Sequence, residues 1–178
     1  MGEQAYHQEG HRNPTPATDL IIHYVDHQSQ RDGIVLVQRG KSPYGIAIPG
    51  GHAEWGLSYA DNALKEGREE TGLTLKLLSD PHYPFTVRSE PDRDPRGHYA
   101  TVVYVAQGSG VLIPGSHDDA REVRLYTRAE LVACIQQHNF IPAGERKRLR
   151  AQEPTAPVFA FDDHADILLE YIRSIRWT

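Results

Sequence analysis

The chain has 178 residues, a net charge of −5 and 39% hydrophobic residues, a composition that suits one globular domain and excludes fibrous and low-complexity proteins. An acidic chain is a poor general binder of nucleic-acid phosphates. The single cysteine, Cys134, excludes an internal disulfide and any multi-cysteine zinc or iron–sulfur site. Because no apolar stretch approaches the roughly 18 residues of a membrane span and no signal peptide is visible, we expect a cytoplasmic protein without nucleic-acid or membrane partners.

The first part of the chain is predicted to be a polar arm followed by two strands. Residues 1–18 are polar and interrupted by prolines, which favours a flexible N-terminal arm, and residues 19–178 then form the domain. Residues 19–25 and 33–39 are short β-rich runs separated by a polar turn. Residues 41–51 contain repeated Pro and Gly and are predicted to be a loop.

Residues 58–71 carry the strongest helical pattern. Ser58 is a suitable N-cap, with Asp61 three residues later, and Gly72 stands where a left-handed C-terminal cap belongs. We therefore expect a helix that begins just after Ser58 and ends before Gly72.

The second part of the chain alternates strands and helices. In chain order we expect a strand at 73–78, a turn-rich region at 81–98, strands at 98–107 and 122–127, a helix at 128–138, a basic connector at 145–157 and a helix at 163–175. Strands interleaved with a few helices predict an α/β (α+β) sandwich with a mixed central sheet between helices.

Three glutamates on the first predicted helix indicate metal-assisted chemistry. Glu66, Glu69 and Glu70 are three and four residues apart and share one helix face, where like charges repel by roughly a few tenths of a kcal/mol per pair. A divalent cation reverses that repulsion, and hard carboxylate oxygens suit Mg²⁺ or Mn²⁺. Gly50 and Gly51 allow the backbone to approach a ligand closely, and the nearby helix N-terminus favours a phosphate.

The segment 50–73 resembles the signature box of the Nudix hydrolases, G-x5-E-x7-R-E-U-x-E-E-x-G-U, where U is aliphatic. The positions that agree are Gly51, Glu66, Glu69, Glu70, Gly72 and Leu73. Leu57 replaces the first Glu, Lys65 replaces Arg, and Gly67 replaces the aliphatic residue. In the family that Glu and that Arg are thought to brace the box, so losing both avoids leaving one charge unpaired. The resemblance implies the family's α/β/α sandwich with a mixed central sheet.

Three later segments are similar to the ADP-ribose pyrophosphatase branch of the family. They are PDRDPRGH (91–98), HDDAREVRLY (117–126) and FAFDDHADIL (159–168). The resemblance implies a Mg²⁺- or Mn²⁺-dependent pyrophosphohydrolase that converts ADP-ribose to AMP and ribose 5-phosphate. It also implies a small-molecule nucleotide substrate and a homodimer.

The resemblance assigns metal and catalytic roles to particular residues. The implied metal ligands are the Gly50 carbonyl, Glu66, Glu69 and Glu70. The base that activates water is either Glu69 or a carboxylate outside the box, Asp119 or its neighbour Asp118.

Arg39, Arg88 and Arg96 are the candidate contacts to substrate phosphates, because a guanidinium binds phosphate in a bidentate manner. Gly51 is expected to lie against the substrate. The turn around Arg96 also reads as a plain β-turn, and Asp162 or Asp163 as the N-cap of the last helix.

Other functions remain open at this stage. Nucleoside triphosphates, including oxidised ones, dinucleoside polyphosphates and NADH are alternative substrates. The departures at Leu57 and Lys65 also suggest a different class, a Nudix-fold nucleotide sensor with weak catalysis.

Overall fold

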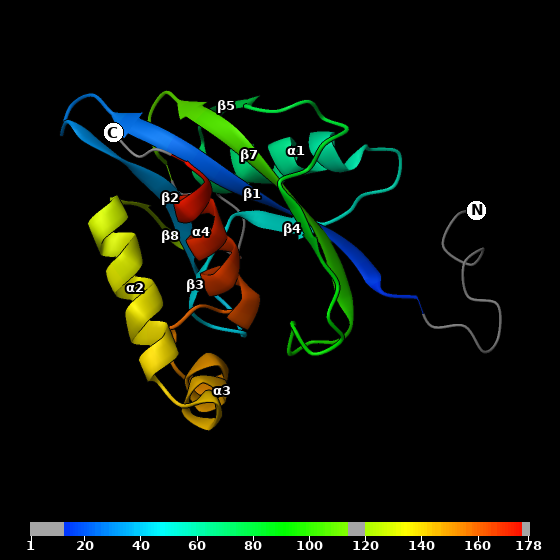
Figure 1. Ribbon diagram of the computed structural model, residues 1–178, viewed down its shortest axis with the longest axis vertical. Helices are drawn as coiled ribbons and strands as arrows, with labels where there is room; N and C mark the ends of the chain where they lie inside the picture. Colours follow the sequence, from blue (N-terminus) through cyan, green and yellow to red (C-terminus); the bar gives the residue numbers. More distant parts are fainter. Residues whose placement is uncertain (1–12, 114–119, 176–178) are drawn as a thin grey trace.

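The computed structural model describes residues 13–113 and 120–175, which form one mixed sheet with helices on both faces (Figure 1). The strands are β1 (Thr15–Asp26), β2 (Arg31–Arg39), β3 (Ile46–Ala47), β4 (Gly50–His52), β5 (Thr74–Leu77), β6 (Thr86–Arg88), β7 (Tyr99–Ser109) and β8 (Ala120–Tyr126). The helices are α1 (Tyr59–Thr71), α2 (Arg128–Phe140), α3 (Ala143–Gln152) and α4 (Asp162–Ser174).

The sheet is mixed, as the sequence predicted. Its main path runs β3-β2-β1-β7-β5, with β4 paired to β1, β6 to β7 and β8 to β2. β1 and β7 are parallel, whereas the other paired strands are antiparallel. This topology places the short strand β4 beside the start of β1, close to the first turn of α1 in the chain.

Alternation along β1 builds a separate core on each face of the sheet. Leu20 and Ile22 belong to a buried cluster that includes Ala60 and Ala63 of α1. Ile21 points to the opposite face and joins residues of α2 and α4. The predicted sandwich is therefore confirmed, with α1 on one side and α2 and α4 on the other (Figure 1).

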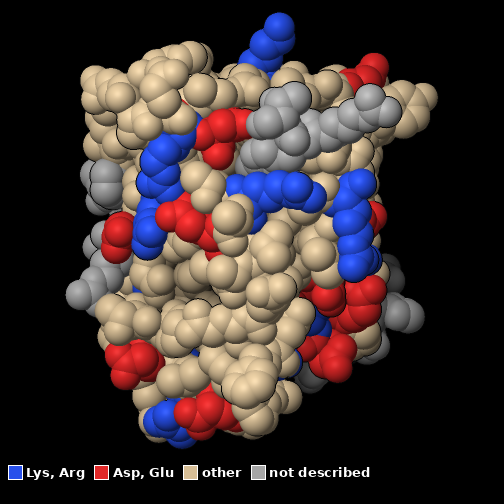
Figure 2. All heavy atoms as spheres, turned by 60° about the vertical axis from the view of Figure 1, so that its left-hand side comes forward, with Lys and Arg blue, Asp and Glu red and all other residues tan. Residues whose placement is uncertain are grey.

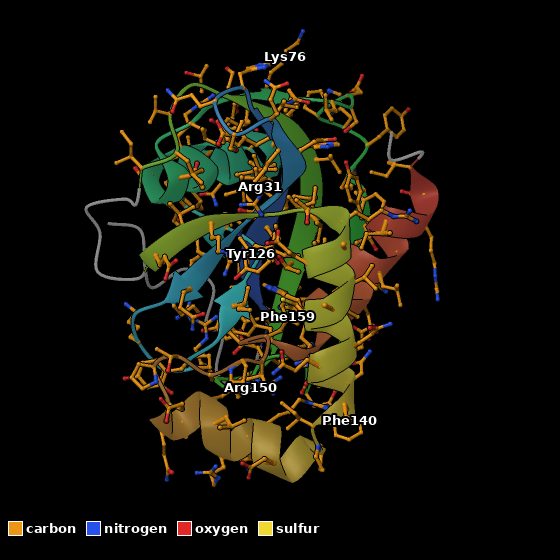
Figure 3. The ribbon with its side chains drawn as sticks, turned by 90° about the vertical axis from the view of Figure 1, so that its left-hand side faces the viewer. Arg31, Lys76, Tyr126, Phe140, Arg150 and Phe159 are labelled. Atoms are coloured by element: carbon orange, nitrogen blue, oxygen red, sulfur yellow. The ribbon has the colours of Figure 1, made fainter. Side chains whose placement is uncertain are left out.

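Several elements differ from the sequence prediction. The predicted loop at residues 41–51 contains β3 and the start of β4, and the turn-rich region at 81–98 contains β6. β1 begins at Thr15, so residues 15–18, which were assigned to the arm, pair with β7 and β4 instead. The expected basic connector contains the helix α3, which lies below the rest of the molecule in Figure 1. Arg150 anchors α3, because its Nε donates to the Phe159 carbonyl at 2.8 Å (Figure 3).

The helix α1 follows its predicted capping. The Ser58 side chain accepts from the Asp61 N–H, and Gly72 has a φ of 70° in the left-handed region. Gly67 is explained by close packing, because a Cβ there would lie 2.8 Å from side-chain atoms of both Leu20 and Leu75. The glycine that departs from the box therefore lets α1 approach the sheet closely.

Basic and acidic side chains are interspersed on the face shown in Figure 2, rather than gathered into one continuous basic surface. None of the helices in the described part of the chain has the length and apolar character needed to cross a membrane.

Candidate active site

β4 and α1 bring two carboxylates against two glycines. Gly50 and Gly51 pair with the start of β1. The Gly50 N–H donates to Glu70 Oε2 at 3.1 Å. A Cβ on Gly51 would lie 2.5 Å from Glu66 Oε2, so glycine at this position permits the approach. The structure thus brings together four residues that are spread over the box sequence.

Glu70 is partly buried beside another negative charge. Burial is the main cause that raises the pKa of Glu70 to about 8, and the Glu66 charge adds to it. The hydrogen bond from Gly50 and the charge of Arg39 act in the opposite direction. A cation bound at Glu66 and Glu70 would favour the ionised form of Glu70 and offset this cost.

Glu69 is directed to a lysine instead. Lys65 Nζ lies 2.9 Å from Glu69 Oε2 and 3.0 Å from Glu54 Oε1, while Glu66 Oε1 is 4.0 Å away. The carboxylates of Glu69 and Glu54 raise the pKa of Lys65. The loss of the box Glu at Leu57 therefore does not leave Lys65 unpaired, because Glu54 supplies a carboxylate from three residues earlier.

The donor set suits a hard divalent cation at Glu66 and Glu70. Across residues 13–113 and 120–175, no three carboxylate, imidazole or thiol side chains are grouped closely enough to form a metal site by themselves. Mg²⁺ needs no such group, since one or two carboxylates commonly hold it together with substrate phosphates and water. Two carboxylates beside a glycine loop match that pattern.

Asn62 fixes the geometry of the box loop and was missed by the sequence reasoning. Its side chain is fully buried and donates to Thr18 Oγ1 at 2.8 Å and to the His52 carbonyl at 3.0 Å. Its Oδ1 accepts from the Glu54 N–H at 3.0 Å. An asparagine on a helix gives no local signal of this role, which depends on its burial against β1 and β4.

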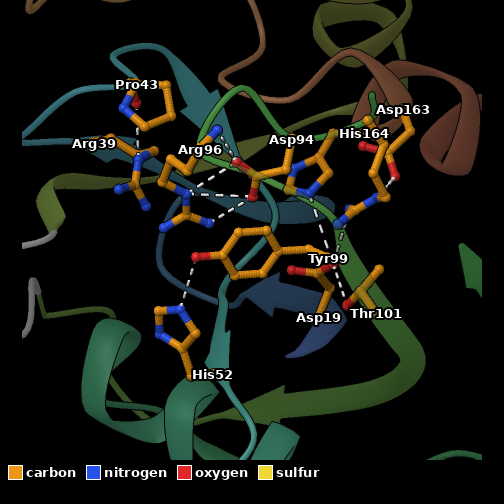
Figure 4. A network of polar contacts seen from close by, with 11 residues as sticks. Asp19, Arg39, Pro43, His52, Asp94, Arg96, Tyr99, Thr101, Asp163 and His164 are labelled. Carbon is orange, nitrogen blue, oxygen red and sulfur yellow. Dashed lines mark hydrogen bonds and ion pairs between the residues drawn. The ribbon is translucent and has the colours of Figure 1, made fainter. Parts of the chain in front are cut away.

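Arg96 lies in the turn at residues 91–98, and its guanidinium is held by Asp94 and the Tyr99 ring (Figure 4). Its Nε and Nη2 donate to the buried Asp94 carboxylate, at 3.0 Å and 2.7 Å, respectively. Its guanidinium carbon is 4.7 Å from the Tyr99 ring centroid and 5.1 Å from that of Phe161. Among the described residues, none forms a hydrogen bond with Arg96 Nη1, which leaves this nitrogen for a ligand. Asp94 Oδ1 also accepts from the Arg96 N–H at 2.9 Å, so the turn chemistry and the guanidinium placement coexist.

A buried charged network lies beneath Arg96. Asp19 accepts from Thr101 Oγ1 at 2.8 Å, with Arg93 Nη2 at 3.8 Å and His164 Nε2 at 3.7 Å (Figure 4). Burial alone would raise the pKa of Asp19, but His164 and Arg93 hold it below its ordinary value. Arg93 Nε also donates to Asp163 at 2.6 Å. These contacts tie β1 to the turn at residues 91–98 and to α4.

His164 links α4 to the segment before the glycine loop. Its Nδ1 accepts from the Ile48 N–H at 3.0 Å, which places the ring proton on Nε2. Within the described residues, the buried His164 Nε2 has no hydrogen-bond partner. Arg93 and His164 lie inside the segments that are similar to the family branch. The sequence did not predict that both side chains are buried.

A small cavity of about 70 Å³ separates the box from this second group of residues. The candidate residues that line it are Arg39, Gly50, Gly51, Glu70 and Arg96. Arg39 donates to the Pro43 carbonyl at 2.8 Å and lies over the Phe161 ring. Arg88 is not in this lining and pairs with Glu170 of α4.

The predictions for the carboxylates outside the box and for the N-cap of the last helix have different outcomes. Asp118 and Asp119 lie outside the described residues. The N-cap of α4 is Phe161 and has no side-chain cap bond, so the N-cap prediction for Asp162 or Asp163 is wrong. Asp162 instead binds Arg150 and His138, which hold its pKa far below the ordinary value although partial burial acts against them.

Comparisons with known proteins show a family relationship. The model of the NUDIX domain matches residues 15–149. A protein of Methanocaldococcus jannaschii named ADP-ribose pyrophosphatase is 35% identical over 131 residues, covering 72% of this chain and 71% of that protein.

Solved structures give the same fold. A MutT/nudix family protein from Enterococcus faecalis is 31% identical with a TM-score of 0.55, and the match covers 67% of this chain but only 46% of that one. The NUDIX domain of Shewanella oneidensis NrtR, solved in complex with ADP ribose, has a TM-score of 0.63 at 18% identity and covers 96% of this chain and 93% of its own. The NUDIX domain and the relative named ADP-ribose pyrophosphatase indicate a hydrolase of pyrophosphate bonds. The chain therefore belongs to the NUDIX family.

Proposed function

We propose that the protein is a Mg²⁺- or Mn²⁺-dependent pyrophosphohydrolase that cleaves ADP-ribose to AMP and ribose 5-phosphate. The observation that carries this proposal is that Glu70 and the glycine loop line one side of a small cavity and Arg96 lines the other. Glu66 does not line the cavity but lies against Gly51, next to Glu70. Such a cavity offers a negative wall for a cation and a positive group for a phosphate.

The reaction adds one water across the diphosphate. The water oxygen bonds to one phosphorus, and the bond from that phosphorus to the bridging oxygen breaks. The protons of the water are shared between the two phosphate products or released to solvent. A divalent cation would neutralise charge on the phosphate oxygens and lower the pKa of the attacking water.

The chain's own residues bind, orient and accept protons. Glu66 and Glu70 would hold the cation, with the Gly50 carbonyl as an additional oxygen. Arg96 would bind a phosphate through Nη1, since Asp94 fixes the rest of the guanidinium. Glu69 is paired with Lys65 and would serve as the base through water, with Asp119 as the alternative.

The choice of ADP-ribose rests on relatives. The curated relative carries the name ADP-ribose pyrophosphatase at 35% identity, and a NUDIX domain with the same fold was solved with ADP ribose bound. In this chain, Arg93, Arg96 and His164 all come from the segments that suggested that branch, and they lie around one cavity.

Purified protein incubated with ADP-ribose, with and without Mg²⁺, tests the proposal when products are separated by chromatography. We expect AMP only with the metal, and no AMP from Glu70→Gln. Glu122→Gln is the matched control, because it makes the same change on β8 away from the cavity. Absence of AMP from the wild-type protein, with tight binding of ADP-ribose, would contradict hydrolysis and favour a nucleotide sensor.

A further inference from the structure

The cavity between the box and Arg96 is too small for a whole nucleoside diphosphate sugar. Its volume is about 70 Å³, whereas pockets for ligands of drug size usually span roughly 300–1,000 Å³. The diphosphate can occupy it, but the groups at the two ends of the substrate must lie outside. At least one of them needs a neighbouring site.

A larger cavity of about 470 Å³ adjoins the first, and we call it the α3 cavity. Arg93 and Arg96 line both cavities. The walls of the α3 cavity come from the loop at residues 42–43, the turn at residues 92–96 and the helix α3. A group attached to a phosphate held by Arg96 would therefore lie next to the α3 cavity.

Most charges around the α3 cavity already have partners. Arg150 binds Asp162 through both terminal nitrogens, at 2.9 Å and 2.6 Å, and these two residues also line the cavity. Figure 3 shows Arg150 between α3 and the body of the molecule. Arg93 and Arg96 are bound to Asp163 and Asp94 as described above.

Two charged residues of the lining stand apart from these pairs. Asp92 and Lys147 are exposed, and no side-chain hydrogen bond or ion pair joins either of them to another residue in the described part of the chain. A carboxylate accepts hydrogen bonds from hydroxyl groups, and an ammonium donates them to hydroxyl and ring oxygens. One charge of each sign favours a neutral ligand with many hydroxyl groups over an anion, which Asp92 would repel.

The rest of the lining argues against a nucleobase. The described residues that line the α3 cavity include Pro43, Pro95, Ala143 and Ala151, and none of its described lining residues is aromatic. A base would therefore have no aromatic ring to stack on in the α3 cavity.

We infer that the α3 cavity binds the sugar attached to the second phosphate of a nucleoside diphosphate sugar, with Asp92 and Lys147 as the residues that select it. This inference rests on the proposed function for the direction of the substrate across Arg96. It assigns a specificity role to α3, the helix that the sequence reasoning took for a connector.

Binding of the two separate halves tests this assignment. Ribose 5-phosphate and AMP are titrated by calorimetry into the wild-type protein, Asp92→Asn and Lys147→Met. We expect each variant to weaken binding of ribose 5-phosphate about tenfold, the loss of one charged hydrogen bond, and to change that of AMP less than twofold. Arg148→Met is the matched control, because Arg148 lies on α3, pairs with Glu145 and does not line the cavity.

The outcomes separate this inference from the proposed function. Weaker binding of AMP with unchanged ribose 5-phosphate would place the nucleoside in the α3 cavity and overturn the inference. Equal losses for both ligands, no loss for either, or no ribose 5-phosphate binding by the wild-type protein would also overturn it, even if ADP-ribose is hydrolysed. A selective loss of ribose 5-phosphate binding without ADP-ribose hydrolysis would uphold the sugar site and reject the proposed reaction.

Discussion

The two walls of the small cavity are built in different ways. The acidic wall comes from one continuous segment, residues 50–73, in which a glycine loop and a helix place Glu70 in the lining and Glu66 against Gly51. The basic wall is assembled from β2, the turn at residues 91–98 and α4. A local motif therefore supplies the group that would hold a cation, whereas tertiary packing supplies the groups that would hold the substrate.

The largest expected effect concerns the acidic wall. Glu70→Gln removes a charge from the cation site while keeping the size of the side chain, so we expect kcat to fall about a thousandfold, roughly 4 kcal/mol. Thermal unfolding should show that the variant is folded. Activity within tenfold of wild type, measured over a range of Mg²⁺ concentrations, would show that the acidic wall does not carry the chemistry.

Removing a buried charge from the basic wall should lower the stability of the protein. Arg93→Met leaves the mostly buried Asp163 without its cation and Asp19 with only His164 nearby, so we expect the free energy of unfolding to fall by about 3 kcal/mol. Denaturant unfolding measures the loss. Asp163→Leu combined with Arg93→Met should recover part of it, and a single variant as stable as wild type would show that this wall does not depend on its buried charges.

The loop of the acidic wall depends on Asn62. Asn62→Ala removes three hydrogen bonds from a fully buried site and leaves Thr18 and the His52 carbonyl without their donor. We expect a loss of about 2 kcal/mol in unfolding free energy. Asn139→Ala makes the same change at an exposed position of α2 and is the control. Equal stability of both variants would remove Asn62 from the account.

The close approach of α1 to the sheet can be tested at Gly67. Gly67→Val restores an aliphatic residue of the kind found in the family box, but its side chain would meet Leu20 and Leu75. We expect overpacking to cost about 1–2 kcal/mol despite the better helix propensity of Val. A stabilised variant in a thermal unfolding experiment would show that the helix can shift to accept the larger residue.

Stability should also depend on pH through Glu70. The pKa of Glu70 is raised from 4.5 to about 8, so between these values the folded metal-free protein binds more protons than the unfolded chain. Its contribution to the free energy of unfolding therefore falls as pH rises from about 4.5 to about 8 and is constant above. In denaturant unfolding with a chelator present, Glu70→Gln should lack this pH dependence of the unfolding free energy. The same pH dependence in Glu70→Gln and wild type would show that Glu70 does not cause it.

The sequence predicted the acidic wall because its information is local. The caps at Ser58 and Gly72 and the spacing of Glu66 and Glu70 follow from helix geometry alone. The sequence also selected Arg39 and Arg96, yet the same reasoning selected Arg88, which lies away from the cavity. Nothing in the local pattern distinguishes an arginine held beside the cavity from one paired with a surface glutamate.

The residues that the sequence missed act through tertiary contacts. The helix α3 has a strongly charged sequence and no side-chain N-cap bond, so its local pattern does not predict it. It is held by the buried Arg150, which binds the Phe159 carbonyl and Asp162. Asp162 is likewise drawn into ion pairs instead of capping α4. Such preferences emerge only when distant parts of the chain meet.

The acidic wall as a cation site is the central claim, and binding of Mn²⁺ tests it most directly. Calorimetric titration of Mn²⁺ into the wild-type protein, Glu66→Gln, Glu70→Gln and the control Glu122→Gln needs no assumption about the substrate. We predict that wild type and Glu122→Gln bind Mn²⁺ alike and that each of the other two variants binds at least about tenfold more weakly. Equal affinity in all four proteins would contradict the account.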